Sequence, residues 1–424
     1  MLDAKRIRTE RALVEEAIRF KKVEIDLGRY LERDEKRREL LVKAEALKHR
    51  RNEASEAIGK KKRTGEDAST AIAEMKEVGE EIKALDTQLA EVDAELLRLV
   101  SWIPNVPHPS VPRAEADGNQ IVRTVGEAKK FAFPAKPHWD LATSLGLLDF
   151  ERAGKIAGGG FLLFTGKGAR LERALINFMI DLHAQKHGYT EVWPPHLVRA
   201  ECLQATGQLP KLADDMYHLA DDDLYLNPTA EVPITNIYRE EILDGARLPI
   251  RHVGYCASYR REAGSYGRDT RGMVRVHQFD KVELVKIVRP ETSYDEHESL
   301  CADAEAVLQA LGFAYRVVLL AAGDLSFAAS KCYDLETWVP GEERWLEVSS
   351  CSNFEDFQAR RAGIRFRNEK TGKAELAHTL NASGLALPRT FATLLECCQT
   401  ERGTVILPEP LVPYMGGVRE LTPG

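Results

Sequence analysis

The sequence predicts an α+β protein in which a long antiparallel α-helical coiled-coil arm precedes a larger domain of mixed strands and helices. A heptad pattern of apolar residues over 71–99 predicts the arm, and the prolines of WIPNVPHPSVPR end its second helix. Downstream, short strand-like runs alternate with helical patterns without an internal repeat. We therefore expect an N-terminal domain at 1–103 with the arm at about 27–100, a stiff linker at 104–118 and a second domain at 119–424.

Composition restricts the class of protein. The 424 residues are 44% apolar and 29% charged, which is typical of a globular protein with two or three domains. No apolar run approaches the roughly 20 residues of a membrane span, and the start, MLDAKRIRTE, lacks the apolar stretch of a signal peptide. The seven cysteines include no CxxC pair and no zinc-finger spacing. We expect a cytoplasmic protein with reduced thiols, no structural zinc and no membrane partner.

The arm is predicted from apolar residues that recur at intervals of four and three. Leu40, Ala44, Leu47, Ala54 and Ile58 keep this rhythm upstream of a glycine-bracketed connection at 59–65, which makes the two helices antiparallel. At 1.5 Å per residue, a helix of about 33 residues extends about 50 Å, so the hairpin should project into solvent. The seam of the second helix consists of Ala71, Met75, Val78, Ile82, Leu85, Leu89, Val92, Leu96 and Leu99.

Charge is divided unevenly between the two predicted helices. Residues 29–63 contain 13 Lys and Arg against 7 Asp and Glu, whereas residues 66–99 contain 3 against 10. One interpretation is that the helices attract each other. The net charge of −7 excludes a general polyanion binder, so a nucleic-acid contact needs a local patch such as Lys60, Lys61, Lys62 and Arg63 at the tip. Such a patch suits the phosphates of RNA better than the bases of DNA, although many coiled-coil arms bind only protein.

Four downstream segments carry candidate chemistry, and none is a phosphate-binding loop. In GFLLFTGKG, Phe161 stands where that loop needs glycine, and Gly168 stands where it needs Ser or Thr. The first segment is a helix at 171–187 followed by a strand that ends at Pro194 and Pro195. Its apolar face, which we expect in the core, contains Leu171, Leu175, Phe178 and Leu182.

The second segment, LNPTAEVPITN, places Thr229 and Glu231 two residues apart, so in an extended chain they point the same way. A hydroxyl and a carboxylate together suit an ammonium group and a small polar side chain. A polar turn ahead of a helix is the alternative interpretation of this segment alone.

The third segment, residues 259–285, has two strand-like runs around a loop rich in Gly and Arg, as in an antiparallel hairpin. We expect Arg260 and Glu262 to share one face of the first strand, and Phe279 and Glu283 one face of the second. Arg260 and Arg271 suit phosphates, and Phe279 suits stacking on a base. A surface hairpin with incidental arginines is the alternative.

The fourth segment joins LEVSSCSN at 346–353 to LNASGLALPRTFATLLE at 380–396. Glu347 and Ser350 offer the hard oxygen ligands that suit a Mg²⁺ ion bridging phosphates. Arg389 opens a predicted helix, where the helix dipole adds to its own charge beside an anion.

In this order, the segments resemble motif 1 (about 171–197), motif 2 (about 255–285) and motif 3 (about 380–396) of class II aminoacyl-tRNA synthetases. Together with the arm, TAEVPITN, REAGSYGRDTRG, HQFDKVE and VSSCSNFEDFQARR resemble bacterial-type seryl-tRNA synthetases along nearly the whole chain. The resemblance implies a mixed, mainly antiparallel sheet flanked by helices. It also implies an enzyme that activates serine with ATP and passes the seryl group to the 3′ end of tRNA.

The resemblance also implies roles for individual residues. Serine is faced by Thr229, Ala230, Glu231, Arg260, Glu283, Asn381 and Ser383. ATP is contacted by Arg260, Arg261, Glu262, Arg271, Val276, Phe279, Glu347, Val348, Ser349, Ser350 and Arg389. Of these, the residues implied to be catalytic are Arg260, Glu262 and Arg389, and those implied to hold Mg²⁺ are Glu347 and Ser350. The implied partners are ATP, L-serine, tRNA-Ser with its long variable arm, tRNA-Sec where one exists, and a second copy of the chain.

Motif 3 departs from the family pattern at two positions. The family usually has NGSGLAVGR, whereas NASGLALPR here has Ala382 and Pro388 in place of glycines. These changes put the rate and the nucleotide affinity in question more than the reaction. They leave open a specialised duplicate that serves secondary metabolism or drug resistance. A non-catalytic paralogue that binds tRNA or protein through the arm is the alternative of a different class.

Overall fold

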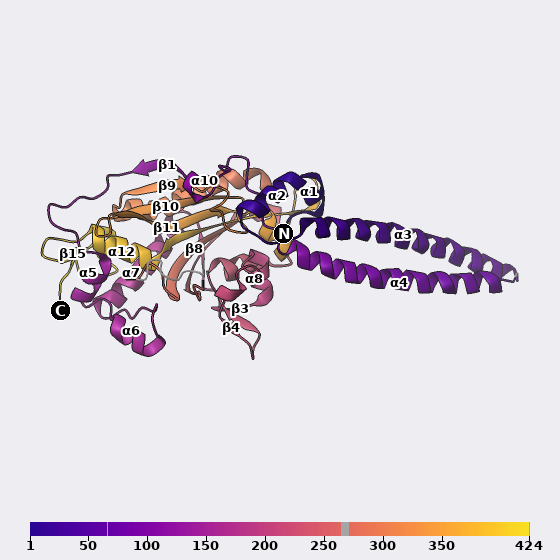
Figure 1. Cartoon of the computed structure of the whole chain (residues 1–424), viewed down its shortest axis with the longest axis horizontal. Coiled ribbons are helices and arrows are strands. Elements are labelled where there is room, and N and C mark those ends of the chain that lie inside the picture. The colour runs from indigo at the N-terminus through magenta and orange to yellow at the C-terminus, as the bar shows by residue number, and fades with distance from the viewer. Residues whose placement is uncertain (66, 264–270, 424) are drawn as a thin grey trace. The chain divides into compact units, whose positions relative to one another are not determined.

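The computed structural model describes residues 1–65, 67–263 and 271–423, and the chain is drawn in Figure 1. It divides into two compact units, Leu2–Pro104 and the chain from Asn105 onward, to which Met1 is joined. The remainder of the expected Gly- and Arg-rich loop, residues 264–270, lies outside the described residues. None of the described helices combines the length and the apolar character that a membrane span requires.

The first unit is helical, and its long hairpin confirms the predicted arm. The heptad residues face the partner helix, because Leu40, Ala44 and Leu89 form one buried cluster with Leu85 and Val92 at its edge. The two long helices have 38 and 32 residues, which correspond to about 57 Å and about 48 Å. The helices of this unit are α1 (Ala4–Thr9), α2 (Arg11–Phe20), α3 (Leu27–Thr64) and α4 (Ser69–Val100).

The predicted connection at 59–65 is wrong, because α3 continues through Gly59 and ends at Thr64. A glycine inside a helix costs only about 1 kcal/mol, which the hydrogen bonds of the continuing helix offset. Basic residues in the last turn also favour the helix, since its C-terminal end carries partial negative charge. The helix stops at Gly65, whose φ of 77° is the left-handed conformation that glycine adopts readily.

Ion pairs between α3 and α4 account for part of the charge difference between the helices. Arg33 lies 2.9 Å from Glu95, and Lys48 lies 2.8 Å from Asp86. In the described part of the arm, Lys60, Lys61, Lys62 and Arg63 are exposed and make no such cross-helix pair. The first interpretation of the charges therefore holds along the hairpin, and the basic cluster occupies the last turn of α3.

The second unit is built on a mixed, mainly antiparallel sheet, as predicted. All neighbouring strands pair antiparallel except β2 and β7. The strand order is β1 (Gln120–Val125), β9 (Tyr315–Leu319), β10 (Lys331–Val339), β11 (Arg344–Asn353), β14 (His378–Ala386), β8 (Gln278–Val288), β7 (Ile250–Tyr259) and β2 (Thr190–Val192).

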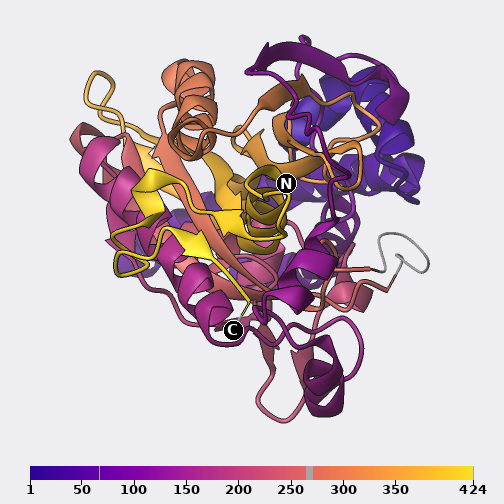
Figure 2. The same ribbon diagram turned by 90° about the vertical axis from the view of Figure 1, so that its left-hand side faces the viewer.

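Three long helices cover one face of this sheet (Figure 2). They are α7 (Lys167–Lys186), α10 (Ser293–Leu311) and α12 (Leu387–Cys397), and α7 contacts both of the others. The predicted apolar face of α7 lies in the core, where Leu171 and Leu175 are fully buried. The helices therefore seal one face of the sheet and leave the other face for polar side chains.

Short elements surround the sheet. The proline-rich segment that follows Pro104 is fastened to the second unit, because the buried Asn105 amide donates to the carbonyls of Ala328 and Phe354 at 2.9 Å. The remaining strands form the small sheets β13 (Ala374–Leu376)–β12 (Arg365–Arg367)–β6 (Ile242–Asp244), β3 (Leu197–Arg199)–β5 (Leu224–Leu226)–β4 (His218–Leu219) and β15 (Val405–Ile406)–β16 (Glu420–Leu421). The remaining α-helices are α5 (His138–Ser144), α6 (Phe150–Ala157), α8 (Ala200–Thr206), α9 (Glu231–Thr235) and α11 (Phe357–Ala362). Single 3₁₀ turns are η1 (Ala116–Gly118), η2 (Ala213–Asp215), η3 (Asn236–Tyr238), η4 (Gly245–Arg247), η5 (Pro290–Thr292) and η6 (Glu409–Leu411).

The seam of the hairpin predicts a position-specific effect on stability. Leu40→Ala removes a side chain that is 2% exposed, so we expect it to destabilise the hairpin by about 2 to 3 kcal/mol. Val42→Ala on the same helix is the control, because Val42 is 67% exposed and its loss should cost less than about 0.5 kcal/mol. Hydrogen exchange of the α3 and α4 amides measures both. Equal loss of protection in the two variants would contradict a packed seam.

Candidate active site

The pleat of the central strands separates core from cavity. On β8, Val282 and Leu284 belong to the main hydrophobic core, whereas Phe279, Lys281 and Glu283 line a cavity of about 530 Å³. The same alternation on β14 places Asn381 and Ser383 in the cavity and Ala382 in the core. The prediction that Phe279 and Glu283 share one face of β8 is thus confirmed.

The segment 229–231 is not extended, which corrects the prediction made from its spacing. Ala230 is right-handed helical and Glu231 opens α9. The Thr229 hydroxyl accepts a hydrogen bond from the backbone N–H of Glu231 at 3.3 Å, as a residue ahead of a helix does. Thr229, which precedes the helix, and Glu231, in its first turn, nevertheless both line the cavity.

A buried polar network joins three segments that line the cavity. The Lys281 ammonium donates to the Thr229 hydroxyl at 2.7 Å and forms an ion pair with Glu283. The Thr229 hydroxyl and the Asn381 amide donate to the two carboxylate oxygens of Glu283, at 3.3 and 2.8 Å. Burial raises the pKa of Glu283, against the opposing effect of Lys281 and the other donors. The network offers a small ligand both hydroxyl and carboxylate groups.

Glu231 has a second buried partner. The Gln358 amide donates to Glu231 at 2.6 Å, and Gln358 is in turn held by the Thr379 hydroxyl at 2.7 Å. Burial raises the pKa of Glu231 to about 7, and the nearby charge of Glu283 acts in the same direction. A carboxylate with this pKa changes charge near neutral pH.

The loop after β7 brings Arg260 over the aromatic ring on β8. The Arg260 guanidinium lies 5.1 Å from the centre of the Phe279 ring, and its Nε donates to the Pro228 carbonyl at 3.2 Å. The prediction that Glu262 shares a strand face with Arg260 is wrong, because β7 ends at Tyr259 and Glu262 has a φ of 53°. This turn directs Glu262 toward Arg275, and their ion pair of 2.5 Å lines the cavity.

Side-chain oxygen atoms on β11 lie close to an arginine on α12. The Ser350 hydroxyl donates to Asp334 at 2.6 Å and lies 3.2 Å from a Glu347 carboxylate oxygen. Arg389 lies 3.1 Å from the other Glu347 oxygen. Burial opposes ionisation of Glu347, but Arg389 and Ser350 outweigh it and lower the pKa of Glu347. An ionised carboxylate beside a hydroxyl fits a Mg²⁺ ion in its preference for hard oxygen ligands.

Comparison with known proteins identifies the family of the chain. The family model of the seryl-tRNA synthetase N-terminal domain matches residues 1–107, and that of the tRNA synthetase class II core domain (G, H, P, S and T) matches 216–398. A serine–tRNA ligase of Moorella thermoacetica is 56% identical over 100% of this chain and 99% of its own length. The chain belongs to the seryl-tRNA synthetase family.

Solved structures agree with this assignment. A seryl-tRNA synthetase from Pyrococcus horikoshii complexed with ATP matches with a TM-score of 0.93 at 36% identity, over all of both chains. A cytoplasmic serine–tRNA ligase from Naegleria fowleri in complex with AMP matches with a TM-score of 0.85 at 30% identity, over 97% of this chain and 95% of its own. The resemblance drawn from the motifs is therefore confirmed, with the class II core in the second unit.

Several residues that the seryl-tRNA synthetase pattern implies do not line the cavity. Ala230 and Val348 are fully buried in the apolar core, and Ser349 donates from its hydroxyl to the Ser383 carbonyl at 2.7 Å. Arg261 turns away and donates to the Met216 carbonyl at 3.0 Å. Arg271 is exposed and lines a separate hollow beside α5, so its role stays a prediction. The cavity does contain Thr229, Glu231, Arg260, Glu262, Val276, Phe279, Glu283, Glu347, Ser350, Asn381, Ser383 and Arg389.

The two departures in motif 3 have different surroundings. Ala382 is fully buried in the core, so its methyl group points away from the cavity. Pro388 lines the cavity and lies in the first turn of α12, where proline needs no hydrogen-bond partner for its nitrogen. Arg389 therefore keeps the predicted place at the start of a helix.

Sequence reasoning missed Lys281, Arg275 and Gln358. Strand alternation could have found Lys281, since it lies between Phe279 and Glu283 on the same face of β8. Gln358 is 127 residues from Glu231 in the chain, so no local pattern could have paired them.

Proposed function

We propose that the chain joins serine to tRNA in two steps, and that the cavity on the open face of the sheet is where both occur. In the first step serine and ATP give seryl-adenylate and pyrophosphate. In the second, the 3′-terminal hydroxyl of tRNA-Ser, or of tRNA-Sec, attacks the seryl carbonyl, the bond from that carbonyl to the phosphate oxygen breaks, and AMP and the hydroxyl proton leave. The supporting observation is that one cavity joins a carboxylate and hydroxyl network to an arginine–aromatic pair and a set of hard oxygen donors.

The network around Glu283 binds serine in this proposal. The substrate ammonium lies between Glu231 and Thr229, and Glu283 with Asn381 and Ser383 receives the polar end of the substrate. Buried groups that need hydrogen-bond partners reject alanine, because without the hydroxyl they would stay unpaired. Ala230 acts through its packing rather than by contact, since it is fully buried in the core.

The nucleotide lies along β8 and the start of α12. Phe279 stacks on adenine with the Val276 backbone nearby, and the Arg260 guanidinium neutralises the α-phosphate. Glu262 holds Arg275 in the cavity through their ion pair. Arg389 receives the distal phosphates, since it lies at the positive end of α12. Arg261 supports the site by fixing the turn that carries Arg260.

Glu347 and Ser350 would hold Mg²⁺, with Ser349 and Val348 keeping β11 in place by their buried contacts. When bound, the ion neutralises phosphate charge. The Ser350 hydroxyl donates its hydrogen bond to the Asp334 carboxylate, which leaves the lone pairs of the serine oxygen directed elsewhere.

Catalysis in this proposal rests on positioning and charge. The serine carboxylate attacks the α-phosphorus of ATP as the bond to the leaving pyrophosphate breaks, so no proton has to move. Arg260 stabilises the charge that builds on the α-phosphate oxygens. Holding both reactants in line supplies the remaining rate enhancement.

Two surfaces of the chain are proposed to bind its macromolecular partners, tRNA and a second copy of the chain. Lys60, Lys61, Lys62 and Arg63 at the end of α3 contact the phosphates of the long variable arm of tRNA. A second copy of the chain covers the motif 1 region, where Trp193 is 69% exposed beside two prolines. We place the enzyme in the cytoplasm, where its seven cysteines remain free thiols.

Serine-dependent ATP–pyrophosphate exchange by the purified chain tests the function. We expect exchange with serine and at least about 100-fold less with alanine, because the buried network pairs with the hydroxyl. Threonine serves as the second comparison, since it keeps the hydroxyl and adds a methyl group. Exchange without preference among amino acids would overturn the proposal.

The pKa of Glu231 predicts the pH dependence of serine binding. That pKa is raised to about 7, so the carboxylate becomes neutral as the pH falls and loses its attraction for the ammonium. Between pH 8 and pH 6 we expect the KM for serine to rise about tenfold. Glu231→Gln should raise this KM at pH 8 and remove the dependence. A wild-type serine KM that is constant over this range would contradict the assigned role.

Deletion of residues 30–100 separates the two steps. We expect the shortened chain to keep serine-dependent pyrophosphate exchange, because none of the described residues that line the cavity lies in the deleted range. Charging of tRNA-Ser should fall by at least about 100-fold, since the phosphate contacts of the arm are lost. Lys60→Glu with Lys62→Glu in the intact chain is the milder comparison. If the deletion variant charged tRNA normally, the arm would not be its binding element.

A further inference from the structure

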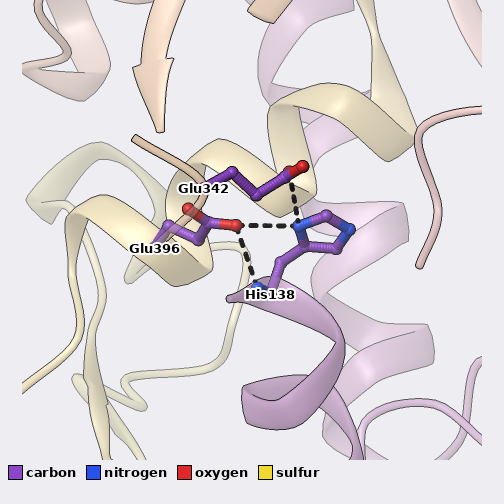
Figure 3. Close-up of side chains that lie close together, drawn as sticks. All are labelled: His138, Glu342 and Glu396. Carbon is purple, nitrogen blue, oxygen red and sulfur yellow. Dashed lines mark hydrogen bonds and ion pairs between the residues drawn. The ribbon is translucent and has the colours of Figure 1, made fainter. Parts of the chain in front are cut away.

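A histidine outside the cavity is held by two glutamates from distant parts of the chain (Figure 3). His138 Nδ1 lies 2.8 Å from a carboxylate oxygen of Glu396 and 3.4 Å from Glu342. The side chains of His138 and Glu396 are fully buried. His138 opens α5, Glu396 lies on α12, and Glu342 lies between β10 and β11.

The hydrogen bonds of this cluster account for its geometry without a metal ion, although its spacing would suit one. One Glu396 oxygen accepts from the His138 backbone N–H at 2.9 Å and also contacts Nδ1. The other accepts from the Gly341 backbone N–H at 2.8 Å. With both oxygens engaged, Glu396 fixes the orientation of the ring and favours the proton on Nδ1.

The opposite nitrogen of His138 faces the chain that leads into β8. Nε2 accepts a hydrogen bond from the backbone N–H of Met273 at 3.3 Å. The ring also lies directly against Gly272, where an added Cβ atom would be 2.2 Å from Nε2. Val274, Arg275 and Val276 follow at once and line the cavity, so the ring supports the start of a nucleotide-facing segment.

Helix α12 is hydrogen-bonded to residues 272–276 at two points, once directly and once through His138. Arg389 donates to the Val274 carbonyl at 3.4 Å, and Glu396 reaches the Met273 N–H through His138. Arg389 and Glu396 are seven residues apart, or about two helical turns, and so lie on the same side of α12. The Met273 N–H and the Val274 carbonyl are therefore both held by hydrogen bonds that lead to α12.

We propose that His138 is a positioning residue for ATP, which fixes residues 272–276 against α12 so that Val274, Arg275 and Val276 present the nucleotide side of the cavity. It does not line the cavity itself and therefore touches no substrate. The role rests on the ATP-dependent reaction proposed above. It differs from a purely structural role because it acts on one substrate of the two.

Two substitutions of His138 distinguish the contribution of Nδ1 from that of Nε2. In His138→Asn the side-chain amide replaces Nδ1 and keeps a donor for Glu396, but the Met273 N–H loses its acceptor. In His138→Gln the amide oxygen reaches the place of Nε2 and keeps that acceptor. In pyrophosphate exchange we expect the KM for ATP to rise about tenfold in His138→Asn and less than about threefold in His138→Gln. The KM for serine should stay within about twofold in both.

The positioning role would be overturned if the KM for ATP rose equally in the two variants. It would also be overturned if the KM for serine rose as much as the KM for ATP. Thermal unfolding of both variants shows whether each is folded at the assay temperature. Failure of the proposed function is recognised separately, because the wild-type chain would then show no serine-dependent exchange.

The pH dependence of the KM for ATP in the wild type provides a test that does not require His138→Asn to fold. The charged groups that face the ring are Glu396 and Glu342, the latter paired with Arg344. Burial lowers the pKa of His138, but the two carboxylates outweigh it and raise the pKa above its ordinary value. Protonation places an N–H on Nε2 against the Met273 N–H. The KM for ATP should therefore rise as the pH falls in the wild type and less in His138→Gln, and identical profiles would overturn the proposal.

Discussion

The pleat of three neighbouring strands is the constraint on which the site depends. On β8 and β14 alternate side chains point to opposite faces, and on β11 a register shift at Val348 brings both Glu347 and Ser350 to the cavity, so each strand contributes to the core and to the cavity. Helices α7, α10 and α12 cover the apolar face. Because the register of the strands is fixed by burying Val282, Leu284 and Ala382, the polar residues between them have no freedom to leave the cavity.

Burial gives the polar residues their chemical properties. Removing a carboxylate from water is costly unless partners replace the lost hydrogen bonds, and Glu283 has three such partners in Lys281, Thr229 and Asn381. The same burial leaves Glu231, with Gln358 as its neutral partner, at a pKa of about 7. The site is therefore organised before a ligand arrives, which reduces the entropy lost on binding.

Helix α12 contacts two segments that line the cavity. Arg389 near its start contacts Glu347 on β11 and Val274 ahead of β8, and Glu396 two turns later orients His138. Proline at position 388 is compatible with this arrangement because the first turn of a helix needs no donor there. The departures from the usual motif 3 thus fall where the backbone tolerates them. The hairpin arm is a separate unit with its own seam, so its stability does not depend on this helix.

The sequence by itself determined the periodic features, because the 3.5-residue seam and the two-residue strand alternation are local and repeat. It predicted the arm, the shared face of Phe279 and Glu283, and Arg389 at a helix start, and its family resemblance implied the mixed sheet. It failed at Gly59, where α3 continues through the glycine, and at Glu262, where one positive φ turns the chain. Only the tertiary structure paired Gln358 with Glu231 and His138 with Glu396, which are 127 and 258 residues apart. Such pairs form because folding buries both groups at one place and each must replace its lost water, and no local pattern records that requirement.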